Sequence, residues 1–243
     1  MFDDQGQDNT PIGDCRACSF RRNLLLAGRC TPGDTCVAVP SGRQIDRFFR
    51  NNPQVAGQYL TDEFWERRAI AVRYAPVEAL TPLIRDSDEV VRRAVAYRLP
   101  REQLAALLQD EDREVRITVA DRLPLEQLEQ LAADPDYLVR AYVVQRIAPG
   151  RLFRFIRDDD RQVRKLVAQR LPEMSLGLMA HDPEPEVRRI VASRLHGDDV
   201  VEMLHDPDWT VRLAAVENAP LEALRGLDEQ DPEVRRAIGE RLG

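Results

Sequence analysis

Residues 134–147 read Asp-Pro-Asp-Tyr-Leu-Val-Arg-Ala-Tyr-Val-Val-Gln-Arg-Ile, and the Val139-Arg140 pair in this stretch decides the fold. The pair recurs every 24 residues, and an Asp stands five residues before each Val. The pairs are Val91-Arg92, Val115-Arg116, Val163-Arg164, Val187-Arg188 and Val211-Arg212, and the Asp residues are Asp86, Asp110, Asp134, Asp158, Asp182 and Asp206. The frame continues to Arg68, where Arg67 replaces the Val, and to Val234-Arg235, where it is one residue shorter. A fixed period of this length indicates stacked repeats, about eight of them over residues 62–243.

The second half of each repeat has the pattern of an α-helix. In the quoted stretch, apolar residues on one helical face are spaced i, i+4 and i+8, at Val139, Val143 and Ile147. We expect Asp134 to cap the first free amides and Pro135 to occupy the first turn, where its missing N–H costs nothing. Pro149 predicts that the helix ends shortly before it.

The first half of each repeat is shorter. Leucines recur every three residues within residues 124–131, at Leu125, Leu128 and Leu131, and residues 100–108 have the same form. A spacing of three aligns side chains in a 3₁₀ helix as well as, or better than, in an α-helix. The pattern predicts a short helix, and the periodicity alone leaves its type open.

These patterns together predict an all-α solenoid. No segment alternates apolar and polar residues with a period of two, so no sheet is required. Each repeat has too little apolar face to fold alone, and neighbouring copies must cover it. A solenoid of this kind presents a long surface to partners.

The repeats resemble the leucine-rich repeat variant family. The resemblance is clearest at Asp112 and in residues 115–124, which read Val-Arg-Ile-Thr-Val-Ala-Asp-Arg-Leu-Pro. It implies alternating α and 3₁₀ helices in a right-handed superhelix without the usual β-strand. The chain departs from the pattern at Arg67, at His196 and at Glu217-Asn218, so we expect less regular packing in the end repeats.

Two arginines per repeat form regular rows. The first row is Arg68, Arg92, Arg116, Arg140, Arg164, Arg188, Arg212 and Arg235, and the second is Arg98, Arg122, Arg146, Arg170 and Arg194. One interpretation is a stripe that binds an anionic partner. The other, which we favour, is pairing with acids of the same or the next repeat, such as Asp88, Asp112, Asp136, Asp160, Glu184 and Asp208. Exposed pairs of this kind are each worth less than about 1 kcal/mol.

Composition narrows the class of protein. Of 243 residues, 43% are apolar, and Lys165 is the only lysine beside 34 arginines. Residues 51–243 hold 28 basic and 36 acidic residues, so the repeats should repel a phosphate backbone, which makes nucleic acid an unlikely partner. No stretch has the roughly 20 apolar residues of a membrane span. The acidic start, Met1-Phe2-Asp3-Asp4, is unlike a signal peptide, and we expect a cytoplasmic protein.

All four cysteines lie near the N-terminus, at Cys15, Cys18, Cys30 and Cys36. Three uses of this set remain open. Two disulfides fit a cytoplasmic chain poorly. A structural zinc usually takes two close Cys-x2-Cys pairs, whereas the last two cysteines here have five residues between them. A 4Fe–4S cluster tolerates varied spacing, and its negative charge would suit Arg16, Arg21, Arg22 and Arg29.

The family resemblance extends to this module. Some leucine-rich repeat variant proteins carry an N-terminal 4Fe–4S cluster on four cysteines, which implies Cys15, Cys18, Cys30 and Cys36 as ligands here. We therefore expect a cluster module in residues 1–40, with zinc as the alternative metal. Residues 41–61 should form a linker and capping helix with Ile45, Phe48 and Phe49 on its apolar edge, and residues 62–243 the solenoid.

The expected function is a protein-binding scaffold whose cluster is structural or redox-sensing. The alternative is an electron carrier whose solenoid docks a redox partner. A third class, an enzyme such as a HEAT-like lyase, has little support, because His181, His196 and His205 occupy different repeat positions and no triad or phosphate loop is present. We predict no catalytic residue, a protein partner of unknown identity, and no membrane association.

Overall fold

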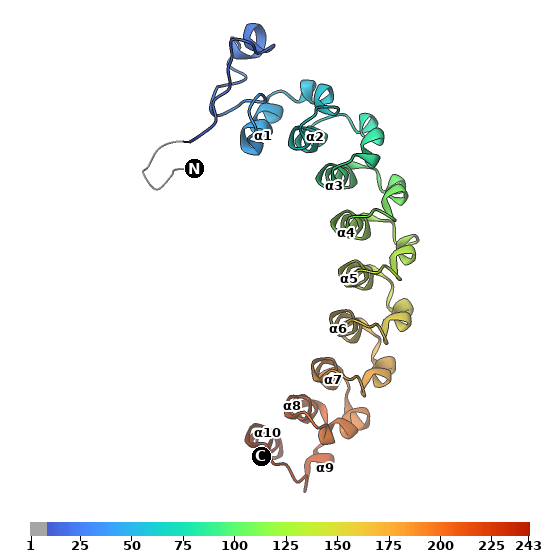
Figure 1. Cartoon of the computed structure of the whole chain (residues 1–243). Coiled ribbons are helices and arrows are strands. Elements are labelled where there is room, and N and C mark those ends of the chain that lie inside the picture. The colour runs from blue at the N-terminus through green and yellow to red at the C-terminus, as the bar shows by residue number, and fades with distance from the viewer. Residues whose placement is uncertain (1–8) are drawn as a thin grey trace. The chain divides into compact units, whose positions relative to one another are not determined.

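The computed structural model describes residues 9–243, which are helical apart from turns and one isolated bridge between Thr31 and Thr35 (Figure 1). Its α-helices are α1 (Gly42–Asn51), α2 (Trp65–Val72), α3 (Glu89–Arg98), α4 (Arg113–Arg122), α5 (Tyr137–Arg146), α6 (Arg161–Arg170), α7 (Pro185–Ala192), α8 (Trp209–Asn218), α9 (Leu221–Leu224) and α10 (Pro232–Leu242). A π-helix, η1 (Arg21–Leu25), precedes them. The 3₁₀ helices are η2 (Pro53–Tyr59), η3 (Val77–Ala79), η4 (Thr81–Arg85), η5 (Arg101–Leu107), η6 (Leu128–Leu131), η7 (Pro149–Phe155), η8 (Glu173–Met179) and η9 (Gly197–His205).

The chain forms two compact units, Met1–Pro124 and Leu125–Gly243. In each unit the α-helices lie side by side in one layer and the 3₁₀ helices lie in another (Figure 1). Helix α3 packs between α2 and α4 in the first unit, and α6, α7 and α8 pack in sequence in the second. This arrangement confirms the all-α fold of repeated helix pairs, and it resolves the short helices as 3₁₀. The last repeat differs, because its short helix α9 is α-helical.

The predicted domain limits stay predictions. The boundary between the compact units follows Pro124, inside the repeats, and the predicted cluster module includes residues 1–8, which lie outside the described part of the chain. The handedness of the superhelix also stays a prediction. Within the described residues, no helix combines the length and the apolar composition needed to cross a membrane.

Equivalent positions of successive repeats build the core. The first such position is fully buried at Val91, Val115, Val139, Val163, Val187, Val211 and Val234. A second is buried at Leu80, Leu104, Leu128, Leu152, Leu176, Val200 and Leu224. Full burial of one such side chain stabilises a protein by about 1.5–3 kcal/mol. Since one repeat contributes only a few of them, its core is complete only beside its neighbours, as predicted.

The predicted helix cap is wrong by two residues. Asp134 accepts a hydrogen bond from the Asp136 amide at 2.9 Å, and Asp136 caps α5 by accepting one from the Leu138 amide at 2.8 Å. Pro135 therefore lies in the turn before the helix, not in its first turn. The first Asp closes a local turn with its own backbone, which leaves the second Asp in the capping place. The same cap recurs at Asp88, Asp112, Asp160, Asp208 and Asp231.

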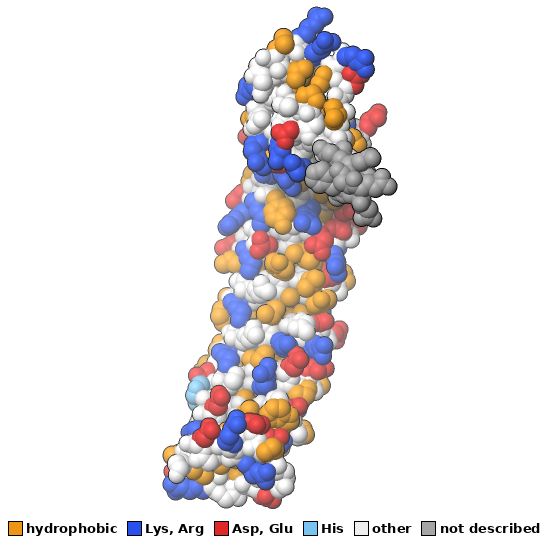
Figure 2. Space-filling model, turned by 90° about the vertical axis from the view of Figure 1, so that its left-hand side faces the viewer, with side chains coloured by type: hydrophobic (Ala, Val, Ile, Leu, Met, Phe, Trp, Pro, Cys, Tyr) orange, Lys and Arg blue, Asp and Glu red, His pale blue; other side chains and the backbone are white. Residues whose placement is uncertain are grey.

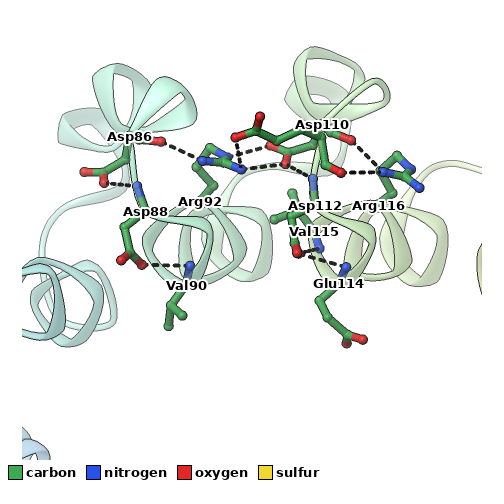
Figure 3. A network of polar contacts seen from close by, with 10 residues as sticks. Asp86, Asp88, Val90, Arg92, Asp110, Asp112, Glu114, Val115 and Arg116 are labelled. Carbon is green, nitrogen blue, oxygen red and sulfur yellow. Dashed lines mark hydrogen bonds and ion pairs between the residues drawn. The ribbon is translucent and has the colours of Figure 1, made fainter.

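The first row of arginines forms an ion-pair ladder between consecutive repeats (Figure 3). Arg92 donates from Nε and Nη2 to the Asp110 carboxylate at 2.8 and 3.0 Å, and from Nη1 to the Asp86 carbonyl oxygen at 2.8 Å. One guanidinium thus binds the backbone of its own repeat and the side chain of the next. The further ladder pairs are Arg68–Asp86, Arg140–Asp158, Arg164–Asp182, Arg188–Asp206 and Arg212–Glu229.

These pairs confirm internal pairing but correct two details of it. The partners are the first Asp of each repeat, not the capping acids that were expected. The pairs are also buried, with the side chains of Arg92 and Asp110 only 7% and 5% exposed. Because each arginine also binds backbone carbonyls, it is held between repeats and away from solvent. The small energy expected of exposed pairs therefore does not apply. Arg235, at the end of the row, is exposed.

One ladder position compensates for a shorter repeat. The other pairs join residues 18 apart, whereas Arg212 and Glu229 are 17 apart. Glu229 accepts from Arg212 Nε and Nη2 at 2.7 and 2.9 Å. Glutamate has one methylene more than aspartate, and this extra reach keeps the bidentate contact where the frame has lost a residue.

Arginines of the second row donate to backbone carbonyl oxygens of the preceding repeat. Arg98 donates to the carbonyl oxygens of Val72 and Ala75, at 2.7 and 3.1 Å, near the end of the preceding α-helix. A cation is favourable beside the free carbonyls of a helix C-terminus. Arg122, Arg170, Arg194 and Arg241 make equivalent contacts. Asn218 takes the position where Arg is usual and makes one such bond, to Ala192 at 3.3 Å. The less regular packing expected of the end repeats stays a prediction.

Candidate metal centre

The four cysteines lie in a short segment before α1. All four, Cys15, Cys18, Cys30 and Cys36, are free thiols and partly exposed. The disulfide interpretation is therefore not supported. The only helix between them is the single-turn π-helix η1, so turns and hydrogen bonds to α1 determine where the thiols stand.

A tight turn separates the last two cysteines. Thr31 and Thr35 exchange backbone hydrogen bonds of 2.9 and 2.8 Å, and Gly33 between them has a φ of +80°. Only glycine adopts this conformation without strain. This turn returns the chain so that Cys36 comes back towards Cys30.

Two buried amide side chains hold the cysteine segment against α1. Gln44 donates from Nε2 to the Pro11 carbonyl oxygen at 2.8 Å, and the backbone carbonyl oxygen of Gln44 accepts from the Cys36 amide at 3.3 Å. Asn52 donates from Nδ2 to the carbonyl oxygen of Arg29 at 2.9 Å, directly before Cys30. Both side chains are almost fully buried, and they fix the backbone at Pro11 and directly before Cys30, while the backbone bond to Gln44 fixes Cys36.

The thiols influence one another electrically. Burial, followed by the negative charges of Cys18, Cys15 and Cys36, raises the pKa of the Cys30 thiol. A Cβ atom added to Gly13 would lie 2.8 Å from Cys36 Sγ, and Cys15 Sγ lies 3.8 Å from the Gly13 carbonyl oxygen. The four sulfur atoms thus share one region, where the negative charges of the other three oppose ionisation of Cys30. A bound cation reverses this repulsion.

The residues fit a metal cluster by the chemistry of their donor atoms. Four thiols in one module can serve zinc or an iron–sulphur cluster. Within residues 9–243, no three or more Cys, His, Asp or Glu side chains already stand in metal-binding geometry.

An aromatic cluster packs beneath the cysteines. The ring centroid of Phe20 lies 5.3 Å from that of Phe48, and the centroid of Phe49 lies 5.2 Å from that of Tyr59. Burial, followed by the charge of Cys18, raises the pKa of Tyr59 to about 12. The Tyr59 hydroxyl therefore remains protonated at neutral pH and can only act as a hydrogen-bond donor or a neutral acceptor beside the thiols.

Arginines surround one of the cysteines. A surface pocket of about 510 Å³ is lined by Arg16, Cys18, Ser19, Arg21 and Arg22. No acidic residue lines this pocket, although Arg16 Nε also contacts Asp14 at 3.2 Å. Figure 2 shows basic and apolar side chains together at this end of the molecule. Such a pocket suits a negatively charged group.

Arg67 joins the cysteine segment to the first repeat, a role that sequence reasoning missed. Its Nε donates to the Val37 carbonyl oxygen at 2.8 Å and its Nη2 to that of Ala38 at 3.2 Å, directly after Cys36. Its Nη1 also donates to Asp62 at 3.1 Å. The signal was present, because Arg67 stands where every central repeat has a buried Val.

Comparisons with known proteins agree with this geometry. The family model described as the LRV protein FeS4 cluster matches residues 3–58, and the leucine rich repeat variant model matches residues 90–112, 113–136, 161–184 and 185–208. A Rhodobacter capsulatus relative, "Uncharacterized 27.7 kDa protein in nifB 3'region", is 38% identical over 87 residues, which span 36% of this chain and 35% of that protein. The chain thus matches only about a third of the length of this curated relative.

A solved structure gives the fuller comparison. It is described as a leucine-rich repeat variant with a novel repetitive protein structural motif, and it is 85% identical to this chain. The alignment covers 96% of this chain and all of that one, with a TM-score of 0.94. The chain therefore belongs to the leucine-rich repeat variant family and carries that family's N-terminal iron–sulphur module.

Proposed function

We propose that this chain is a cytoplasmic protein-binding scaffold with a 4Fe–4S cluster held by Cys15, Cys18, Cys30 and Cys36. The observation that carries the proposal is the division of chemistry between the two parts of the chain. The repeats use most of their regular charged residues on one another, in the ladder and in the helix caps. The four electrically coupled thiols gather in the module that matches the FeS4 model.

The repeats support a binding role through what they leave exposed. Several aromatic side chains on the α-helices remain accessible, namely Trp65, Tyr97, Tyr137 and Trp209. Trp and Tyr are the residues that most often dominate the binding energy of protein interfaces. The acidic balance of residues 51–243 and the engaged arginine rows argue for a protein partner over nucleic acid.

The residues near the cysteines suit a negatively charged group. When bound, a 4Fe–4S cluster supplies one-electron redox chemistry. Arg16, Arg21 and Arg22 offset negative charge beside Cys18. Tyr59 keeps its proton beside the same thiol, and Arg67 connects the backbone after Cys36 to α2. These links would transmit a change in the module to the first repeats.

Metal analysis of anaerobically purified protein tests the cluster. We expect about four iron atoms and four sulphides per chain, the content of one such cluster. Single Cys→Ser substitutions at each of the four positions should lower both contents, and Ser19→Ala, in the same segment, should lower neither. Zinc without sulphide would contradict the 4Fe–4S assignment while keeping the four thiols as ligands.

An electron carrier is the second candidate, favoured by the arginine-lined pocket that opens at Cys18. Potentiometry with EPR detection separates the two. A reversible signal near about −400 mV, with rapid electron exchange, supports the carrier. A cluster that stays in one oxidation state and is needed only for folding of the module supports the scaffold with a structural cluster.

A further inference from the structure

A groove runs between the exposed faces of α7 and α8 in the second unit. Its volume is about 450 Å³, and Ile190, Leu213 and Ala214 form its apolar lining. Trp209 stands at the edge with 43% of its surface exposed. Figure 2 shows one face of the molecule, on which exposed hydrophobic side chains (orange) lie between charged ones (blue and red). An exposed Trp beside an apolar groove is typical of a binding surface.

The groove lacks an ion pair that is present between two other pairs of neighbouring α-helices. There a cation on one α-helix meets an acid on the next, 21 residues later in sequence. These pairs are Lys165–Glu186 at 2.8 Å and Arg93–Glu114 at 3.9 Å. Between α7 and α8 the same two positions hold Arg189 and Thr210, so the acid is absent.

Arg189 therefore stands at the groove without a carboxylate across from it. Glu186 lies one turn before Arg189 on α7, but its carboxylate already contacts Lys165 at 2.8 Å. Within the described residues, no hydrogen bond or ion pair engages the Arg189 guanidinium. A carboxylate from outside the chain could take the place that Glu186 has in the preceding pair.

The far end of the groove has the opposite charge. Glu217 lines it, and its exposed side chain makes no ion pair with the described residues. Thr210 and Glu217 are seven residues apart on α8, which corresponds to about 10 Å along the helix. The groove is thus positive near the N-terminal end of α8, apolar in the middle and negative near its C-terminal end.

We propose that this groove binds a short amphipathic helix of a partner protein. The helix would lie parallel to α8, with an acid facing Arg189, apolar side chains on Leu213 and Trp209, and a base facing Glu217. Charges at positions i and i+7, with apolar residues at i+3 and i+4, match the length and the polarity of the groove. The inference rests on the proposed scaffold function and names where, and on what chemistry, the partner is recognised.

The lining favours a helix over an extended strand. It consists of side chains on two α-helices, whose own backbone groups are already bonded within the helices. A strand would find no sheet edge to pair with there, whereas a helix satisfies its own backbone groups internally. An acid near the start of the bound helix and a base near its end also suit the dipole of that helix.

Selection from a displayed library of helix-forming 14-residue peptides on the immobilised full chain tests the proposal. We expect enriched peptides with an acid, an apolar pair and a base at these spacings. In fluorescence anisotropy, Trp209→Ala should weaken their binding about 30-fold, as loss of an interface Trp does. Met174→Ala, at a side chain that is 94% exposed on η8, should leave the binding unchanged.

A charge swap provides the sharper measurement. Arg189→Glu should weaken the peptides about fivefold, and replacing the peptide acid by Lys should restore the affinity. Enriched peptides that bind Trp209→Ala as well as the unaltered chain would overturn the groove but leave the scaffold function standing, because they bind elsewhere. Failure to enrich any peptide on any surface would count against both.

Discussion

Removal of one ladder aspartate should destabilise the repeats several times more than removal of an exposed acid. Asp182 is 3% exposed and its partner Arg164 is 9% exposed, with Nε 2.8 Å from Oδ2. The same carboxylate accepts from the Glu184 amide at 2.9 Å. Asp182→Ala leaves a buried guanidinium without its acid and opens the turn before α7. Breaking a buried pair in this way costs about 3–5 kcal/mol.

The matched control is Glu186→Ala, only four residues away. Glu186 contacts Lys165 at 2.8 Å, but its side chain is 51% exposed, so its loss should cost much less than the loss of Asp182. Urea unfolding at pH 7, followed by circular dichroism at 222 nm, measures both variants. Hydrogen exchange should show the loss of protection in α6 and α7, because the pair joins these two repeats and repeat arrays need not unfold in one step.

A third variant separates charge burial from hydrogen bonding. Arg164→Met combined with Asp182→Leu removes both charges, which alone is often neutral. Arg164 also donates to the Asp158 carbonyl oxygen at 2.7 Å, and loss of this bond should still cost about 1–3 kcal/mol. If Asp182→Ala costs no more than Glu186→Ala, the buried ladder is not what joins the repeats, and the reasoning fails.

Three further changes test other parts of the molecule. The hydrogen bond from Arg212 lowers the pKa of Glu229 from its ordinary 4.5, so the stabilisation from this carboxylate is present above pH 4.5 and is lost as the pH falls through the lower folded-state pKa. Glu229→Gln should flatten this part of a plot of urea midpoint against pH. An unchanged slope would contradict the role given to Glu229. Cys18→Ser should remove iron and sulphide but keep most of the 222-nm signal, because the repeats carry nearly all the helix; loss of the whole signal would mean that the module is not separable. Phe49→Ala, at a fully buried ring, should lower the free energy of unfolding by about 3–5 kcal/mol, measured by urea or heat. The control Ile12→Ala, at an exposed side chain, should change it little. Equal effects would mean that the aromatic cluster does not support α1.

The repeat architecture was predictable because one signal governs it. A single period places Val139 and its equivalents in the core, and the three-residue spacing of leucines favours 3₁₀ helices. The turn at Gly33 and the apolar edge of α1 were predictable from local residue types. In each case the residue pattern and the local backbone preference agree.

The details that sequence reasoning missed depend on contacts between distant residues. Both Asp134 and Asp136 are good capping residues, and only the turn that Asp134 closes decides between them. The burial of Arg92 follows from carbonyls and a carboxylate in two repeats, which no local pattern reveals. Likewise, the geometry of the four thiols depends on Gln44 and on turns without a periodic signal.

Each ladder arginine binds the backbone of its own repeat and the acid of the next, and this limits how many residues the repeat region can gain or lose. Excision of residues 141–164 would bring Arg140 to face Asp182 at the same 18-residue separation that it now has from Asp158, so no charge would be orphaned. A cut that is not a whole number of 24-residue repeats would leave a guanidinium beside the wrong neighbour. Unequal crossing-over can therefore change the copy number in whole 24-residue steps, while single-residue losses persist only where a longer acid such as Glu229 bridges the gap.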